Sequence, residues 1–174
     1  MHNEIERKFL VQKMPKLRGI TPVLQERYFI QSGDLVEEGF KRKGRVFEHE
    51  LKIAITPDER TREVVVITKD EFEKFKPKNG HIIYRDSYPI SKKPLLSIKK
   101  YKGDYEGLVL AEVEFDSHEE AEKWRPLKWM GAEVTDTPLG KDSSLILLSR
   151  KKFKGILGDI EERFNFKNIE GEAS

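Results

Sequence analysis

The chain has 174 residues, of which 33 are Lys or Arg and 31 are Asp or Glu, and its net charge of +2 gives no case for bulk nucleic-acid binding. The absence of cysteine excludes disulfides, thiolate catalysis and zinc–thiolate sites. No run approaches the ~20 apolar positions of a membrane span, and the first residues lack the apolar stretch of a signal peptide, so we expect a cytoplasmic protein without a membrane partner. The length suits one domain over residues 1–174, with a core at about 3–148 and a helical tail at about 143–166.

The first predicted element is a strand over residues 4–11 that carries charge on one face. Side chains alternate between the two faces of a strand, so Glu4, Glu6 and Lys8 share one face and apolar residues point toward a core on the other. Two neighbouring carboxylates repel each other unless a cation lies between them. The pattern fits either the solvated face of an edge strand or a charged site.

Further along the chain, strands dominate and helices are short. Capping boxes at Thr68-x-x-Glu71 and Ser117-x-x-Glu120 predict two helices, the first to residue 75 and the second to about residue 124. So many strands favour an antiparallel barrel with helices on its outside, because closure removes unpaired edges; the fold class is α+β, mainly antiparallel β. The other predicted strands span residues 23–30, 40–43, 46–55, 61–67, 82–90, 95–101 and 107–115.

The strand over residues 107–115 repeats the acidic pattern of the first strand, with Glu112 and Glu114 on one face. Together with Glu4 and Glu6 these residues offer four carboxylates, which suit Mg²⁺ or Mn²⁺, hard cations that prefer oxygen ligands and share a phosphate ligand. That the two strands converge on one cavity is a hypothesis. A barrel interior lined by charge would in turn fit a charged ligand.

Three motifs resemble those of the CYTH family, within the triphosphate tunnel metalloenzymes. They are Glu-x-Glu-x-Lys at residues 4–8, Gly-Leu-Val-Leu-Ala-Glu-Val-Glu at residues 107–114 and Trp-Met-Gly-Ala-Glu-Val-Thr at residues 129–135. They occur in the family's order and together anchor residues 3 to about 145. The resemblance implies an eight-stranded closed, tunnel-like antiparallel barrel that binds triphosphate groups end to end, with metal at its carboxylates.

The resemblance also implies a set of phosphate-binding side chains, because a triphosphate carries about four negative charges that Lys and Arg can offset. Lys8 and Lys52 would act on the reacting phosphates as catalytic residues. Tyr28 would position Lys8 or the attacking water, with packing as the alternative. Glu133 would be a further acid of the substrate site, with a salt bridge as the alternative. The basic residues expected to bind substrate are Lys8, Lys41, Lys43, Lys52, Arg62 and Arg85.

Four single positions and one stretch depart from the family's pattern. Val64 and Val66 hold two places that are usually acidic, Ser87 replaces a basic residue, and Lys99 stands where an acid is expected. Near the end, Gly140-Lys141-Asp142 replaces a Tyr-Tyr-Asn-like stretch of the family. These departures indicate either an altered substrate or a protein that binds without turnover.

Three functions therefore remain open. The first is a metal-dependent hydrolase of tripolyphosphate or of a nucleoside or thiamine triphosphate. The second is a triphosphate- or nucleotide-binding protein with lost or weak catalysis. The third is a class IV-like adenylyl cyclase, for which the sequence offers no recognisable adenine site. The expected partner is a triphosphate-containing small molecule, and a homodimer is left open.

Overall fold

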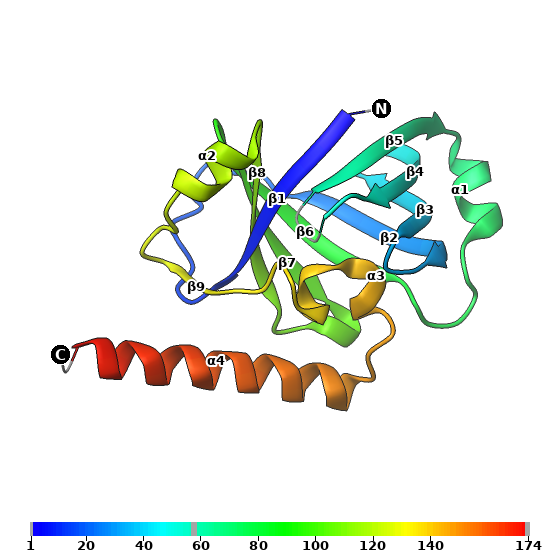
Figure 1. The fold of residues 1–174 in the computed structure, drawn as a ribbon. Helices are drawn as coiled ribbons and strands as arrows, with labels where there is room; N and C mark the ends of the chain where they lie inside the picture. The colour runs from blue at the N-terminus through cyan, green and yellow to red at the C-terminus, as the bar shows by residue number, and fades with distance from the viewer. Residues whose placement is uncertain (1, 57–58, 173–174) are drawn as a thin grey trace.

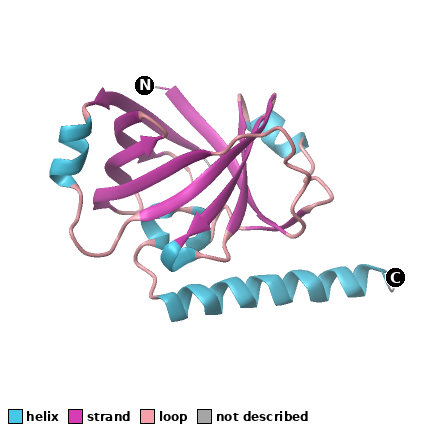
Figure 2. Ribbon diagram, turned by 180° about the vertical axis from the view of Figure 1, so that it is seen from behind, coloured by secondary structure: helices cyan, strands magenta, loops and turns pink. Residues whose placement is uncertain are grey.

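The computed structural model describes residues 2–56 and 59–172, which form nine strands and four α-helices (Figures 1 and 2). Every predicted strand and both capped helices are present, with ends displaced by at most four residues. The strands are β1 (His2–Val11), β2 (Val23–Ser32), β3 (Val36–Lys43), β4 (Val46–Ala54), β5 (Glu59–Ile67), β6 (Ile83–Lys92), β7 (Leu95–Lys102), β8 (Val109–Phe115) and β9 (Met130–Glu133). The helices are α1 (Lys69–Phe75), α2 (His118–Lys123), α3 (Asp142–Leu145) and α4 (Arg150–Glu172), with short 3₁₀ turns η1 (Gly103–Tyr105) and η2 (Pro138–Gly140).

The sheet closes on itself through β1. Antiparallel pairs follow the order β5-β4-β3-β2-β6-β7-β8-β1, and β5 pairs again with the first residues of β1, from His2 to Ile5. From Ile5 to Leu10, β1 pairs with β8 on its other edge. The predicted eight-stranded antiparallel barrel is thereby confirmed.

A ninth strand, which the sequence did not predict, covers the part of β1 that β5 leaves unpaired. In this strand, β9, Glu133 pairs with Phe9 and Met130 pairs with Val11 of β1. Its pairing satisfies an edge that would otherwise expose backbone donors and acceptors.

The barrel wall has its charged face inside and its apolar face outside. On β1, Glu4, Glu6 and Lys8 point into the interior, while Ile5 and Phe9 belong to an apolar cluster that includes Ala121 of α2. Figure 2 shows that α1 and α2 lie against the outside of the strands. The main apolar contacts therefore form between the wall and the helices, and the interior is left for polar groups.

Helix α1 begins at the predicted capping box. The Thr68 hydroxyl accepts a hydrogen bond from the Glu71 N–H at 3.2 Å, and the Glu71 carboxylate accepts one from the Thr68 N–H at 2.8 Å. The buried Phe72 of this helix packs against Tyr28 and Phe40 on the outer face of β2 and β3. The helix thus fixes one outer side of the barrel.

One end of the barrel is covered by η2, α3 and α4. Leu139 and Leu145 join Leu10 and Leu110 in an apolar cluster that also contains Phe153 of α4. Figure 1 shows α3 against the strands and α4 running across the same end. The predicted helical tail is thus two helices, α3 and α4, and the second runs on to residue 172. None of the described helices is both long and apolar enough to cross a membrane.

Candidate functional site

The interior of the barrel contains a cavity of about 370 Å³. Eight basic and five acidic side chains line it, so the basic lining residues outnumber the acidic ones by three. Such an excess favours an anionic ligand, because buried charge is costly without a partner. The basic residues are Lys8, Arg27, Lys41, Lys43, Lys52, Arg62, Arg85 and Lys99, and the acidic residues are Glu4, Glu6, Glu112, Glu114 and Asp142.

The carboxylates of β1 and β8 face one another on the cavity wall. Glu6 lies directly opposite Glu114 in the strand register, and Lys8 lies opposite Glu112. Opposed carboxylates repel, and Lys8 offsets this repulsion because its Nζ lies 3.1 Å from Glu6 Oε1 and 3.8 Å from Glu112 Oε1. Burial alone would raise the pKa of Glu6, but its cationic neighbours, Lys8 foremost, hold that pKa well below its usual range.

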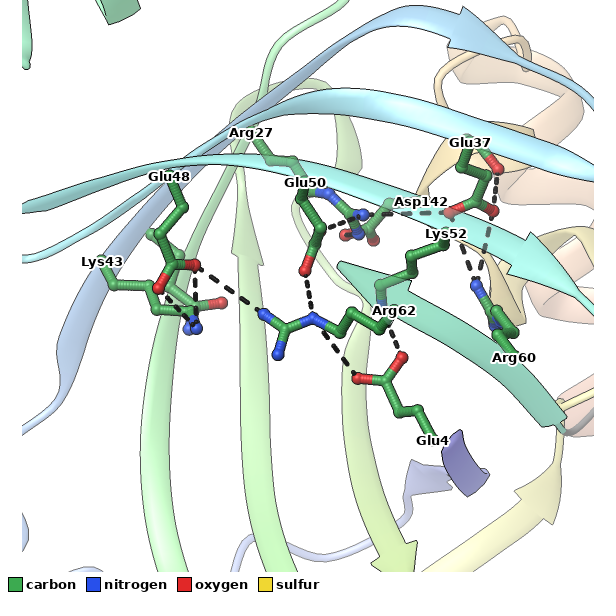
Figure 3. Close-up of polar contacts among 12 residues, drawn as sticks. Glu4, Arg27, Glu37, Lys43, Glu48, Glu50, Lys52, Arg60, Arg62 and Asp142 are labelled. Carbon is green, nitrogen blue, oxygen red and sulfur yellow. Dashed lines mark hydrogen bonds and ion pairs between the residues drawn. The ribbon is translucent and has the colours of Figure 1, made fainter. Parts of the chain in front are cut away.

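Glu50 of β4 lies at the centre of the ionic network on the opposite wall (Figure 3). It is 1% exposed and accepts hydrogen bonds from Arg27 Nη2 at 2.7 Å and Arg62 Nε at 2.6 Å. Burial alone would raise the pKa of Glu50, but Lys52 and the two arginines hold it well below its usual value. Glu50 is therefore ionised and orders the cations around it.

Two lysines on the neighbouring strands β4 and β3 each form an ion pair with a carboxylate (Figure 3). Lys52 Nζ lies 2.6 Å from Glu4 Oε2, and Lys43 Nζ lies 3.0 Å from Glu48 Oε2. Both ammonium groups line the cavity.

The guanidinium groups of Arg27 and Arg85 meet at Asp142, which α3 carries into the barrel. Arg27 Nη1 lies 3.1 Å and Arg85 Nη1 lies 3.2 Å from Asp142 Oδ2, and the Tyr101 hydroxyl donates to Asp142 Oδ1 at 2.6 Å. Burial alone would raise the pKa of Asp142, but the two arginines lower it well below its usual value. This acid therefore carries a full charge among the cations.

Lys41 differs from the other basic residues of the cavity. Its side chain is buried, yet it makes no hydrogen bond or ion pair with any other residue that the structure describes. Burial lowers the pKa of Lys41 well below its usual value, and Arg85, Arg27 and Lys43 lower it further, while Glu50 opposes them. Lys41 is thus an amine with unused hydrogen-bonding capacity that lines the cavity.

Ten of the twelve residues predicted for the site line this cavity, although their chemical roles stay predictions. Tyr28 does not, because it lies on the outer face of β2, fully buried between Phe40 and Phe72, and its hydroxyl donates to the Phe72 carbonyl. The structure therefore gives Tyr28 the packing role that was its alternative.

Glu133 also lies outside the cavity. Its carboxylate accepts from Arg7 Nε at 2.9 Å and from Arg7 Nη2 at 2.8 Å on the outer surface of the barrel. This is the salt bridge that was the alternative for Glu133.

The charged residues of the network that were not predicted for the site include Arg27, Arg60 and Asp142, besides Glu37, Glu48 and Glu50. Arg27 shares a face of β2 with Gln25, but the sequence-based reasoning singled out Tyr28 on the opposite face. Arg60 lies two residues before Arg62 on the same face of β5, and the predicted strand began one residue too late to include it. Asp142 had no strand signal, since it reaches the cavity from a four-residue helix.

The departures from the family pattern divide into two kinds. Ser87 and Lys99 both line the cavity, where Lys99 Nζ donates to Ser87 Oγ at 2.7 Å and lies 3.5 Å from Glu112 Oε2. Val64 and Val66 lie further along β5, and Val66 is 72% exposed. The rebuilt part of the cavity is therefore the wall at Ser87 and Lys99.

The described carboxylates fit a metal site in which the substrate and water supply the remaining ligands. Within residues 2–56 and 59–172, no three His, Asp or Glu side chains lie close enough together to hold a metal ion. Glu6 and Glu114 are directly opposed and line the same cavity, and Mg²⁺ is commonly held by one or two carboxylates together with substrate phosphates and waters. The residues fit a site of this shared type.

No family model matches the sequence. The chain is 30% identical over 148 residues to an inorganic triphosphatase of Nitrosomonas europaea, an alignment that covers 83% of this chain and 97% of that protein. A crystal structure of an inorganic triphosphatase superposes with a TM-score of 0.61 at 27% identity, over 83% of this chain and 97% of that one. A Bacillus halodurans protein suggested to be an adenylate cyclase shares the fold, with a TM-score of 0.51 at 17% identity over 70% of this chain and 86% of that one. With this sequence relationship over most of both chains, the protein belongs to the CYTH family.

Proposed function

We propose that this chain is a phosphohydrolase that cleaves inorganic triphosphate, or an organic triphosphate, inside the barrel. The observation that carries the proposal is the cavity itself, in which eight basic side chains exceed five acidic ones. The similar protein of Nitrosomonas europaea is an inorganic triphosphatase, which supports tripolyphosphate as the first substrate to test.

In this proposal the cations bind and orient the phosphate chain. A water oxygen forms a bond to the terminal phosphorus and loses a proton to solvent, and the bond from that phosphorus to the bridging oxygen breaks. Phosphate is formed, and the leaving group is pyrophosphate from inorganic triphosphate or the organic diphosphate from an organic triphosphate. Lys8 and Lys52 stabilise the charge that develops on the phosphate oxygens. Arg62 and Arg85 hold the chain in place, and Lys41 offers an amine that has no other described partner.

Mg²⁺ or Mn²⁺ is the proposed cofactor. Glu6 and Glu114 would hold it, with Glu4 and Glu112 two residues away on the same faces of β1 and β8. A bound divalent ion would neutralise phosphate charge that the lysines and arginines do not reach.

Binding without turnover is the second candidate. Its support is that Glu4, Glu6 and Glu112 are each already paired with Lys or Arg, while Lys99 occupies a position that the family pattern gives to an acid. A cavity in which these three acids are engaged by cations favours anion binding over metal binding.

The test supplies tripolyphosphate, ATP and thiamine triphosphate with Mg²⁺, with Mn²⁺ or with EDTA, and follows phosphate, pyrophosphate and cyclic AMP. We expect phosphate release that requires the metal. Lys52→Met should lower turnover by about a hundredfold, the cost of losing one group that stabilises transition-state charge, whereas binding should weaken less because other cations remain. Lys100→Met is the matched control, since Lys100 is exposed on β7.

The outcomes separate the candidates. Stabilisation by tripolyphosphate without phosphate release would favour the binding protein, and cyclic AMP from ATP would favour the cyclase. Turnover that Lys52→Met leaves at the wild-type level would place the reaction outside this cavity.

A further inference from the structure

The cavity is exposed at one end and buried at the other. At the first end its lining includes Val23, which is 40% exposed, and Leu95, which is 50% exposed. The lining also includes Arg27, Arg85 and Asp142, which contact one another and are at most 7% exposed. A ligand can therefore reach the cavity from the Val23 and Leu95 end.

Residues 140–143 close the buried end by bonding to the inward faces of the strands. The Gly140 carbonyl accepts a hydrogen bond from Lys8 Nζ at 2.8 Å, and the Ser143 hydroxyl donates to Glu37. Asp142 contacts side chains of β2, β6 and β7. Gly140 is required for this close approach, because a Cβ there would lie 2.3 Å from the Val134 carbonyl oxygen.

Behind this segment, among residues 2–56 and 59–172, apolar packing and a separate groove lie where a second entrance would open. Leu139 and Leu145 pack with Phe153 of α4 in an apolar cluster. A separate outer groove, lined by Pro138 and Ser144, shares no lining residue with the cavity. In the part of the chain that the structure describes, residues 140–143 therefore form a floor at one end of the tunnel-like barrel.

We propose that a phosphate chain enters this pocket end-first and that Asp142 is the specificity-determining residue that fixes how deep its terminal phosphate can go. The proposal rests on the proposed function and specifies its substrate class as linear polyphosphates with a free end. The Asp142 carboxylate repels a terminal phosphate and shares the positive charge of Arg27 and Arg85, so these guanidinium groups bind that phosphate less strongly than they would without Asp142. Phosphates that do not fit between the floor and the rim remain in solvent.

The first test measures binding stoichiometry by titration calorimetry, with EDTA present to prevent metal-dependent turnover. Tripolyphosphate is compared with a long-chain polyphosphate and with a chain twice as long. A linear chain has two ends, so we expect no more than two protein molecules per chain at either length. A number of bound proteins that doubles with chain length would overturn end-first entry. If tripolyphosphate itself neither binds nor is hydrolysed with metal, the proposed function fails as well, which distinguishes the two failures.

The second test addresses the floor. Asp142→Asn keeps the shape of the side chain and removes its charge, so we expect tripolyphosphate to bind about tenfold more tightly, as one additional charge-assisted hydrogen bond would give. Ser144→Ala is the matched control, because Ser144 lies in the same helix and lines the outer groove. Unchanged or weaker binding by a folded Asp142→Asn protein would overturn the role of Asp142, and the stoichiometry of the wild-type protein tests the pocket even if this variant does not fold.

Discussion

Glu50 is the most buried of the described carboxylates, at 1% exposed, and Glu50→Gln should measure how much its charge contributes to stability. The substitution keeps the size of the side chain and removes the charge that Arg27 and Arg62 contact at 2.7 and 2.6 Å. Removing one partner of a buried ion pair typically costs about 3–5 kcal/mol, since the other charge is left uncompensated.

The neighbouring contacts place the expected loss at the lower end of this range. Arg27 retains Asp142 at 3.1 Å, and Arg62 lies 3.8 Å from oxygens of both Glu4 and Glu48, which can take over part of the pairing. We therefore expect Glu50→Gln to lower the free energy of unfolding by about 3 kcal/mol, which for a domain of this size corresponds to roughly 6–12 °C in melting temperature.

Chemical and thermal unfolding with matched variants provide the assay. Glu63→Gln is the control, because Glu63 is exposed on β5 opposite Leu51 of β4. Tripolyphosphate should stabilise Glu50→Gln more than the wild type, since the variant cavity has one negative charge fewer and ligand binding to the native state adds to its stability. If Glu50→Gln costs no more than Glu63→Gln, the network does not depend on this carboxylate and the reasoning is wrong.

Three further predictions concern pH, the unpaired amine and the outer wall. The folded-state pKa of Glu50 lies below its ordinary value of 4.5, so its contribution to stability is present above pH 4.5 and is lost as the pH falls toward the folded pKa; the unfolding free energies of wild type and Glu50→Gln should converge on acidification. The lowered pKa of Lys41 predicts that tripolyphosphate binding takes up a proton between that pKa and 10.5, measured by calorimetry in buffers of different ionisation enthalpy; an equal uptake in Lys41→Met would contradict the assignment. Tyr28→Phe should lower the unfolding free energy by ~1 kcal/mol through its lost hydrogen bond and leave triphosphate turnover unchanged, and a large loss of turnover would return Tyr28 to the site.

The strands could be predicted because each has a charged face and an apolar face, and alternation identifies the faces whatever the tertiary structure. Alternation does not say which face lies inside the barrel. On β2 both faces carry polar side chains, Gln25 and Arg27 on one and Glu26 on the other, and the sequence alone gave no reason to prefer the first. The error over Tyr28 has this origin, whereas β1 and β8 were unambiguous because their charged and apolar faces are cleanly separated.

The closed end of the cavity could not be predicted for a different physical reason. Asp142 reaches Arg27 and Arg85 because its segment is held against the barrel by apolar contacts of Leu139 and Leu145 with α4 and by hydrogen bonds of Gly140 and Ser143 to the strands. These contacts join residues that are distant in sequence and belong to short elements, so no periodic pattern precedes them. The four-residue strand β9 was missed because it is also a short element whose partner, β1, is distant in sequence.

The carboxylates of the cavity explain how eight cations can be held in one small interior before any ligand binds. Without acids such as Glu50 and Asp142, mutual repulsion would drive the lysine and arginine side chains apart. The desolvation penalty of each buried cation would also have no attraction to offset it. The pairs fix the positions of the cations, and the basic side chains that line the cavity can share their charge with a polyanion. A bound phosphate chain must then share cations with carboxylates already in place, which favours ligands whose charges match the spacing of those cations over anions of equal charge and different shape. Under the proposed function, the acids of this barrel therefore make ligand binding more selective and weaker. The Asp142→Asn protein should bind a wider range of anions and should bind tripolyphosphate more tightly.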